Sequence, residues 1–302
     1  MYKYFFLLFL TCCTSNQPPQ KISFVPKRNT VAKFYCSLEN SSKISIEVNN
    51  KKVENNKKVM INYFYDFTVD TLGNRIINIT FEKFFVNIKN NDDEEDYSSE
   101  KEDESSIMMD KVLKLIKGSS IQIEIDSKGK ITKVLGAEDI STKVIKSLPD
   151  YQDNSNDIIK KQISEFIGQN FIKENLVNNF QLIPDSAIAI GTTWKQKTGN
   201  FNQIPINAEV ENKLVSVNNG VGLLISKATI TTNNLKTLSV MDLNVKSDLN
   251  GELNGEYKIL ENSGFVLKAN SKLNLSGTIT VSNQDIPITL KMTKSFKAEV
   301  VK

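Results

Sequence analysis

Apolar and polar residues alternate along much of this chain, which is the pattern of a strand with one buried face. In residues 59–70 every odd position is apolar or aromatic, whereas four of the six even positions are polar. A turn signal at residues 72–74 follows, and residues 75–89 are predicted to form the return strand. The alternation slips at Phe84 and Phe85, which predicts a β-bulge at that point.

The same pattern recurs through the rest of the chain. Residues 121–125 and 131–135 predict a hairpin, and Asn218-Asn219-Gly220 is a strong signal for a tight turn between two further strands. Later apolar alternation predicts strands at positions 210–217, 221–231, 236–248, 250–260, 264–275 and 286–300.

Only the middle of the chain has helical spacing of its apolar residues. Residues 138–148 and 157–180 are predicted to be helices, and the second has one apolar face. That face comprises Ile159, Ile163, Phe166, Ile167 and Phe171.

The order of elements is therefore strands, helices, strands, with strands in the majority. Many antiparallel strands protect their edges by curling or closing. We predict a mainly β fold: a large curved antiparallel sheet or open barrel with two or three helices in the middle of the chain. Two sheet-containing halves that meet at the helices are the alternative topology.

The N-terminus has the pattern of an export signal. Residues 1–11 contain one lysine followed by an apolar run that is shorter than the about 20 residues needed to span a bilayer. Two cysteines follow directly. Leu10 lies three positions before Cys13, as in a bacterial lipobox, whereas the equivalent residue for Cys12 is Phe9. We predict that Cys13 is lipidated, with Cys12 as the alternative.

These features predict the division of the chain. Residues 1–12 are expected to be a lipoprotein signal peptide, and residues 13–28, which are rich in Pro, Ser, Asn and Gln, a flexible tether. Residues 29–302 are expected to be a single β-rich domain with a helical segment at 137–180. The protein is then exported to the cell envelope. There we expect an outer-membrane-anchored lipoprotein that faces the periplasm or the cell surface.

An acidic insert interrupts the first group of strands. Residues 92–104 contain nine acidic residues and one lysine, while the whole chain has a net charge of +3. Like charges at this density repel one another, and the run has little to bury, so residues 91–106 are predicted to be disordered. The run lacks the spaced Asp, Asn and Gly pattern of a calcium loop.

Composition excludes several chemistries. Histidine is absent, which excludes Ser-His-Asp and Cys-His catalysis and His-ligated metals. There are two arginines, so a site of paired arginines is not expected. We find no phosphate loop or dinucleotide motif, and we predict no enzyme activity, no metal, no cofactor and no binding of nucleic acid. Cys36 and Trp194 are both expected to be core residues.

Three turn-centred stretches resemble a known family. The first stretch runs from Ile121 to Gly136 and has its turn at Gly129. The second contains Leu182, Pro184, Gly191 and Trp194. The third contains Leu253, Gly255, Tyr257, Ser263-Gly264-Phe265, Gly277 and Ile286-Pro287-Ile288.

In this order they resemble an uncharacterised family, with a domain of unknown function, of exported β-rich lipoproteins from Bacteroidota. The resemblance spans most of residues 30–302. It implies a β-rich fold and export, but it implies no activity and no site residues. The order of elements is also similar to that of the periplasmic lipoprotein carriers, which implies a curved sheet around helices with an apolar hollow.

These observations favour a non-enzymatic, membrane-anchored envelope lipoprotein that binds an apolar ligand or an envelope partner. One alternative is a hydrolase of glycans or lipids that uses carboxylates such as Glu138, Asp139, Asp150 or Asp153. The other is a structural or interaction module. Residues expected to face inward and to line the ligand site are Tyr63, Tyr65, Phe67, Phe81, Ile123, Leu223, Ile225, Phe265 and Leu267, together with Ile288 and Leu290. The same residues also fit an ordinary core.

Overall fold

The computed structural model describes most of the chain after the first twenty residues. The described residues are 21–48, 51–102, 107–127, 131–147, 163–164, 167–168, 171–172, 183–184, 186–201, 204–232, 238–240, 243–281 and 284–301. The predicted signal peptide, both candidate lipidation sites and residues 13–20 of the predicted tether lie outside them. The prediction of a flexible tether is wrong for residues 21–28, because Lys21–Ile22 forms β1, which pairs with β8, and Ile22 and Phe24 are buried.

Fifteen strands and two helices are delimited in these residues. In chain order they are β1 (Lys21–Ile22), β2 (Val31–Val48), β3 (Lys51–Val69), β4 (Arg75–Asn90), β5 (Asp93–Ser98), α1 (Met108–Ile116), β6 (Ser120–Ile125), β7 (Ile131–Leu135), α2 (Ala137–Lys146), β8 (Ile188–Ala189), β9 (Thr193–Phe201), β10 (Ile204–Asn218), β11 (Val221–Thr231), β12 (Leu238–Val240), β13 (Leu243–Leu260), β14 (Val266–Val281) and β15 (Gln284–Val300).

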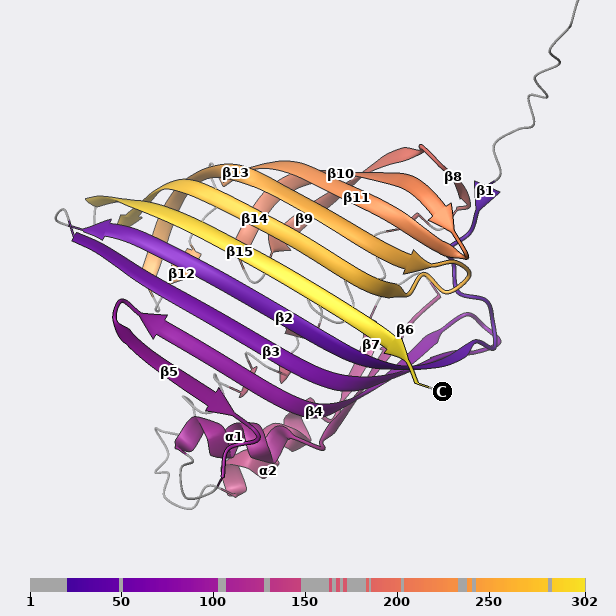
Figure 1. Ribbon diagram of the computed structural model, residues 1–302, viewed down its shortest axis with the longest axis horizontal. Helices are drawn as coiled ribbons and strands as arrows, with labels where there is room; N and C mark the ends of the chain where they lie inside the picture. Colours follow the sequence, from indigo (N-terminus) through magenta and orange to yellow (C-terminus); the bar gives the residue numbers. More distant parts are fainter. Residues whose placement is uncertain are drawn as a thin grey trace, which may run out of the picture.

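One large antiparallel sheet dominates the fold and confirms the predicted class. Its strands follow the order β7-β6-β4-β3-β2-β15-β14-β13-β11-β10-β9, with β5 paired to β4 and β12 paired to β13. In the described part of the chain β7 and β9 form the two ends of this order and do not pair, so the sheet is open. In Figure 1 the long strands curve together, and β9 passes behind the strands at the centre.

The first long strand pairs with the last one at the centre of the sheet. Val300 lies opposite Phe34, and the ladder continues to Ile288 opposite Ile46. The strands before the helices and the strands after them therefore belong to one sheet, and the alternative of two separate sheet-containing halves is wrong.

The helices pack beside β5, at the edge of the sheet where β5 pairs with β4 (Figure 1). Each buries one apolar face, with Val112, Leu113 and Ile116 on α1 and Ile140 and Val144 on α2. Helix α2 confirms the first predicted helix, whereas α1 was not predicted.

Part of the second predicted helix is described. Its residues at 163, 164, 167 and 171 are helical, and Ile163, Ile167 and Phe171 are buried, as the periodicity predicts. Ile159 and Phe166 lie outside the described residues.

The prediction of disorder in the acidic insert is wrong for residues 93–98, because they form β5. Residues 103–106 lie outside the described part. Asn87 donates hydrogen bonds to Glu94 (2.9 Å) and Asp96 (2.7 Å), and Lys89 lies 3.5 Å from Glu94. Cross-strand amide and ammonium donors thus offset the repulsion between the carboxylates.

Turn geometry follows the sequence closely. Asn219 and Gly220 both have positive φ (50° and 74°), as the two-residue turn between β10 and β11 requires. The bulge in β4 falls at Glu82, between the pairs Asn62–Lys83 and Tyr63–Phe81, and not at the predicted Phe84.

Candidate functional site

The inner face of the sheet bears two apolar clusters. The first cluster comprises the buried apolar side chains of β1–β4, β6, α1, α2 and residues 163–172, with Phe24, Ile188, Leu214, Leu224, Ile259, Phe265, Val266, Ala269, Phe296 and Ala298. The second cluster comprises Ala208, Val210, Ala228, Ile230, Leu249, Leu253, Leu273, Leu275, Leu290 and Met292.

The two clusters differ in what fills them. Helical side chains pack into the first cluster. In the second cluster, every member and every apolar side chain packed against it comes from a strand, as far as the chain is described. All ten members are at most 9% exposed, so this apolar surface is shielded from water.

Most of the residues predicted to line a ligand site belong to the first cluster. Tyr63, Tyr65, Phe67, Phe81, Ile123 and Phe265 are all at most 3% exposed. The Phe265 ring stacks on Phe34, with ring centroids 3.8 Å apart. The Tyr65 ring tilts against Phe265, with centroids 5.2 Å apart. Leu267 is partly buried against this cluster, whereas Leu290 belongs to the second cluster and Ile288 packs against it. Their ligand role stays a prediction.

The expected inward direction of Leu223 and Ile225 is wrong. Ile225 pairs with exposed Lys213 and Glu256, whereas the intervening Leu224 is 2% exposed and faces the first cluster. Three consecutive apolar residues occur here, so alternation alone does not determine which face is buried.

A row of polar positions crosses the inner face between the two clusters. Asn212 on β10 pairs with Ser226 on β11, Ser226 with Gly255 on β13, and Gly255 with Ser271 on β14. Ser271 then pairs with Lys294 on β15, and Lys294 with Asn40 on β2. We call these six residues the polar row.

The apolar neighbours on each strand show that the polar row faces inward. Two positions to one side lie members of the second cluster: Val210, Ala228, Leu253, Leu273 and Met292. Two positions to the other side lie residues that belong to the first cluster or pack against it: Leu214, Leu224, Tyr257, Ala269, Phe296 and Leu38.

Asn212 is the most unusual member of the polar row. Its side chain is fully buried, and its Oδ1 accepts a hydrogen bond of 2.5 Å from Ser226 Oγ. Its Nδ2 finds no acceptor in the described part of the protein. A buried amide donor without a partner destabilises a fold by about 1–3 kcal/mol, so such a group calls for an explanation.

Tyr257 brings a second donor to the same stretch of the row. A Cβ atom on Gly255 would lie 2.8 Å from Tyr257 Oη, so the phenol lies directly over this glycine. Burial raises the pKa of Tyr257 to about 12, which keeps the hydroxyl protonated at neutral pH. A side chain at 255 would therefore collide with the ring of Tyr257 unless that ring moved.

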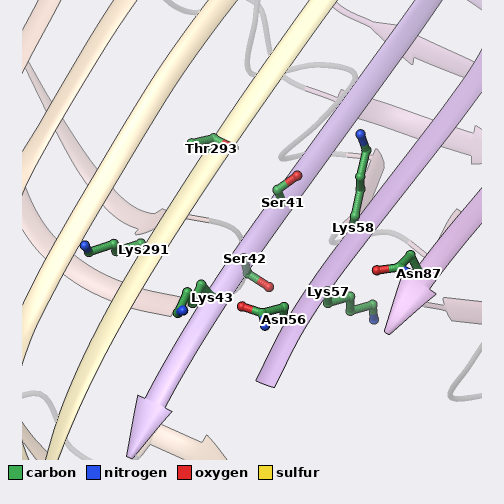
Figure 2. Close-up of a pocket in the computed structure, with 9 residues that line it drawn as sticks. All are labelled: Ser41, Ser42, Lys43, Asn56, Lys57, Lys58, Asn87, Lys291 and Thr293. Carbon is green, nitrogen blue, oxygen red and sulfur yellow. The ribbon is translucent and has the colours of Figure 1, made fainter. Parts of the chain in front are cut away.

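A surface hollow of about 310 Å³ lies over β15, β2, β3 and β4. Figure 2 shows the side chains that line it. Its lining includes four lysines and three hydroxyl side chains: Ser41, Ser42, Lys43, Asn56, Lys57, Lys58, Asn87, Lys291 and Thr293. Carboxylates offset part of this charge, because Lys43 lies 2.8 Å from Glu54 and Lys58 lies 3.1 Å from Glu39.

Candidate catalytic groups are dispersed. Glu138 and Asp139 are exposed in the first turn of α2, where acids favour the helix dipole, and Asp150 and Asp153 lie outside the described residues. Among the described residues, no three acidic or cysteine side chains gather as a metal site would need. Cys36 is buried, as predicted, and burial raises the pKa of its thiol. Trp194 is partly buried against the first cluster.

A family model of unknown function (DUF6263) matches residues 72–266, more than half of the chain. No curated protein matches. The part of the chain that the structure describes contains no helix long and apolar enough to cross a lipid bilayer.

Solved structures match only distantly. One, described as lipid–protein interactions in lipovitellin, has 11% identity and a TM-score of 0.46, covering 92% of this chain. This chain spans 25% of that one. DynF from Micromonospora chersina has 5% identity and a TM-score of 0.21, with 95% of this chain and 88% of that one covered. A putative outer membrane lipoprotein-sorting protein domain from Vibrio parahaemolyticus has 9% identity and a TM-score of 0.14, with 87% and 85% covered. All three TM-scores are below 0.5, so no function is assigned from them.

Proposed function

The chain belongs to the DUF6263 family of unknown function, and we propose that this member binds an apolar ligand without catalysing a reaction. The observation that supports this most is the second cluster. It is an apolar surface on the inner face of an open sheet, and strands alone supply its described side chains. Apolar, water-shielded concave surfaces are the usual sites for hydrocarbon ligands.

Trp194 makes this proposal testable, because it is the only tryptophan of the chain. It lies opposite Asn212, and the neighbouring pair along the strands, Gln196 and Val210, reaches the second cluster. An uncharged brominated alkane that binds the second cluster is expected to quench Trp194 fluorescence saturably in delipidated protein.

Two matched substitutions distinguish the two clusters. Ala228→Leu adds three carbons to the second cluster, and Ala269→Leu adds the same volume to the first. Overpacking costs a similar amount of stability at both sites, about 1–3 kcal/mol. We expect Ala228→Leu to weaken alkane binding several-fold and Ala269→Leu to leave it unchanged. Absence of saturable quenching in the unsubstituted protein would overturn the proposed function.

We further propose that the protein is an envelope lipoprotein anchored through Cys13, or through Cys12. The sequence pattern at residues 1–13 supports this, and no property of the sheet depends on it. Intact mass measurement of the mature N-terminus from native membranes is expected to give a diacylated or triacylated cysteine. An unmodified N-terminus in the soluble fraction would contradict the anchor but not the ligand site.

A further inference from the structure

The polar row divides an otherwise apolar inner face, and this division suggests what kind of ligand the face accepts. We propose that the Asn212 end of the row recognises an uncharged oxygen of an amphipathic lipid, such as an ester carbonyl, while the hydrocarbon chain lies over the second cluster. This inference rests on the proposed function and adds the chemistry of the ligand's polar end.

The Asn212 side chain offers an unpartnered donor. Asn212 is fully buried, and its Oδ1 is already occupied by Ser226 Oγ. In this arrangement Nδ2 is the free end of the amide, and it has no acceptor in the described part of the chain. An acceptor atom from a ligand would satisfy it.

The surroundings of Asn212 in the polar row are uncharged. The side chains nearest to Asn212 in the row are Ser226 and the phenol over Gly255, and both are neutral. The positive group of the row, Lys294, lies four strands away from Asn212, a separation of about 19 Å along the sheet at 4.8 Å per strand. Among the described members of the polar row, none next to Asn212 is a cation that could pair with a buried carboxylate there, so a neutral acceptor is favoured.

The second cluster begins directly beside Asn212. Val210 and Ala228, two residues from Asn212 and Ser226 on their own strands, both belong to the second cluster. A lipid whose polar oxygen meets Asn212 can therefore extend its chain along the strands without crossing another described polar position of the row. Tyr257 Oη, over Gly255, supplies a donor for a second oxygen.

The test compares ligands of equal chain length that differ only at the polar end. Dodecane, methyl dodecanoate and dodecanoate compete with the brominated alkane for the delipidated full-length protein. The variant Asn212→Leu with Ser226→Ala removes the polar pair. We expect the affinity for methyl dodecanoate to fall about five-fold, as for loss of one hydrogen bond, and the affinity for dodecane to stay unchanged.

The outer face of the sheet offers a matched control. Ser295 Oγ donates to Asn270 Oδ1 at 3.1 Å, which is the same cross-strand pair of side chains in an exposed place. The variant Asn270→Leu with Ser295→Ala should leave both affinities unchanged. Tyr257→Phe, which keeps the ring, should reduce only the affinity for the ester and provides a second test if the first variant fails to fold.

The outcomes separate the two proposals. No binding of dodecane or ester would overturn the proposed function and this inference together. Equal loss of dodecane and ester in the Asn212 variant, or no loss of either, would overturn the inference and leave the proposed function standing. Tighter binding of dodecanoate that is lost in Lys294→Met would overturn the neutral acceptor, because the polar end would then lie at Lys294.

Thermal melting provides an independent readout. Removal of a buried donor that lacks a partner is expected to leave the melting temperature of the ligand-free protein equal or higher. A large decrease for Asn212→Leu with Ser226→Ala would show that the pair serves the fold, and it would count against recognition of a ligand.

Discussion

Asp110 is a fully buried carboxylate near the start of α1, and its surroundings explain why it is tolerated there. Its Oδ1 accepts a hydrogen bond from the Ser98 amide (2.6 Å), and its Oδ2 accepts one from the Ile107 amide (3.1 Å). Lys101 Nζ lies 3.4 Å from Oδ2. One side chain thus caps the helix and ties it to the end of β5.

We predict that Asp110→Ala lowers the free energy of unfolding by about 2–3 kcal/mol, because two part-buried backbone amides lose the carboxylate that accepts their hydrogen bonds. Asp139→Ala is the control, since Asp139 also lies in the first turn of a helix but is exposed. Urea unfolding of both variants measures the difference. Equal effects at the two positions would contradict the role assigned to Asp110.

Glu54 should give the stability a dependence on acid pH. Lys43 lies 2.8 Å and Lys52 2.6 Å from its carboxylate, and these ammonium groups lower its pKa from 4.5 to about 2. The group therefore stabilises the folded state above pH 4.5, and this contribution is lost as the pH falls from 4.5 to about 2. Salt should weaken the effect, because the pair is exposed.

The measurement for Glu54 is the melting temperature of Glu54→Gln against that of the unsubstituted protein across this range. We expect the two curves to differ above pH 4.5 and to converge toward pH 2. Glu47→Gln, at an exposed glutamate of β2, is the control. The difference between its melting temperature and that of the unsubstituted protein is expected to stay the same across this pH range. Parallel curves for Glu54→Gln throughout the range would refute the assignment.

At the scale of elements, β5 closes an edge of the sheet. It covers β4 from Phe85 to Asn90, and Tyr97 packs against the first cluster. We predict that replacing residues 92–98 with a short Gly-Ser linker lowers the melting temperature and promotes self-association through the exposed edge of β4. Melting and light scattering measure the two effects.

A charge-neutral variant separates the strand from its charge. Glu94→Gln, Glu95→Gln and Asp96→Asn keep the backbone ladder, so stability should change little. If the linker variant is stable and monomeric, the acidic insert is a dispensable loop and β5 does not protect the edge of β4.

At the scale of the whole molecule, β15 connects the strands that precede the helices in sequence to the strands that follow them. It pairs with β14 on one side and with β2 on the other. We predict that a chain ending at residue 283, which lacks β15, does not fold cooperatively. Removal of β15 opens the centre of the sheet and exposes both clusters. Circular dichroism with thermal melting is the measurement. A sharp transition in the truncated chain would show that the strands after the helices form an independent unit.

The sequence by itself predicted many of the strands and the tight turn between β10 and β11, but it did not predict β2 or β9. Alternation at 59–70 and positive φ at Asn219 and Gly220 are local properties, fixed by the pleat and by backbone sterics. It did not reveal β5, because the carboxylates of that strand repel one another and their partners Asn87 and Lys89 belong to β4, so the residues of β5 alone do not show what offsets the repulsion. The helical spacing of Val112, Leu113 and Ile116 could have predicted α1, but the acidic residues just before them led to a prediction of disorder up to residue 106 and no prediction of the helix.

Only the tertiary structure decided how the strands pair, and therefore what gathers on the inner face. Asn212, Ser226, Ser271 and Lys294 each interrupt an apolar alternation on their own strand, and each one alone is unremarkable in the sequence. Their union into one row depends on the register of strands up to 254 residues apart, from Asn40 to Lys294. Register is a property of pairs of strands, so a single strand's pattern does not contain it.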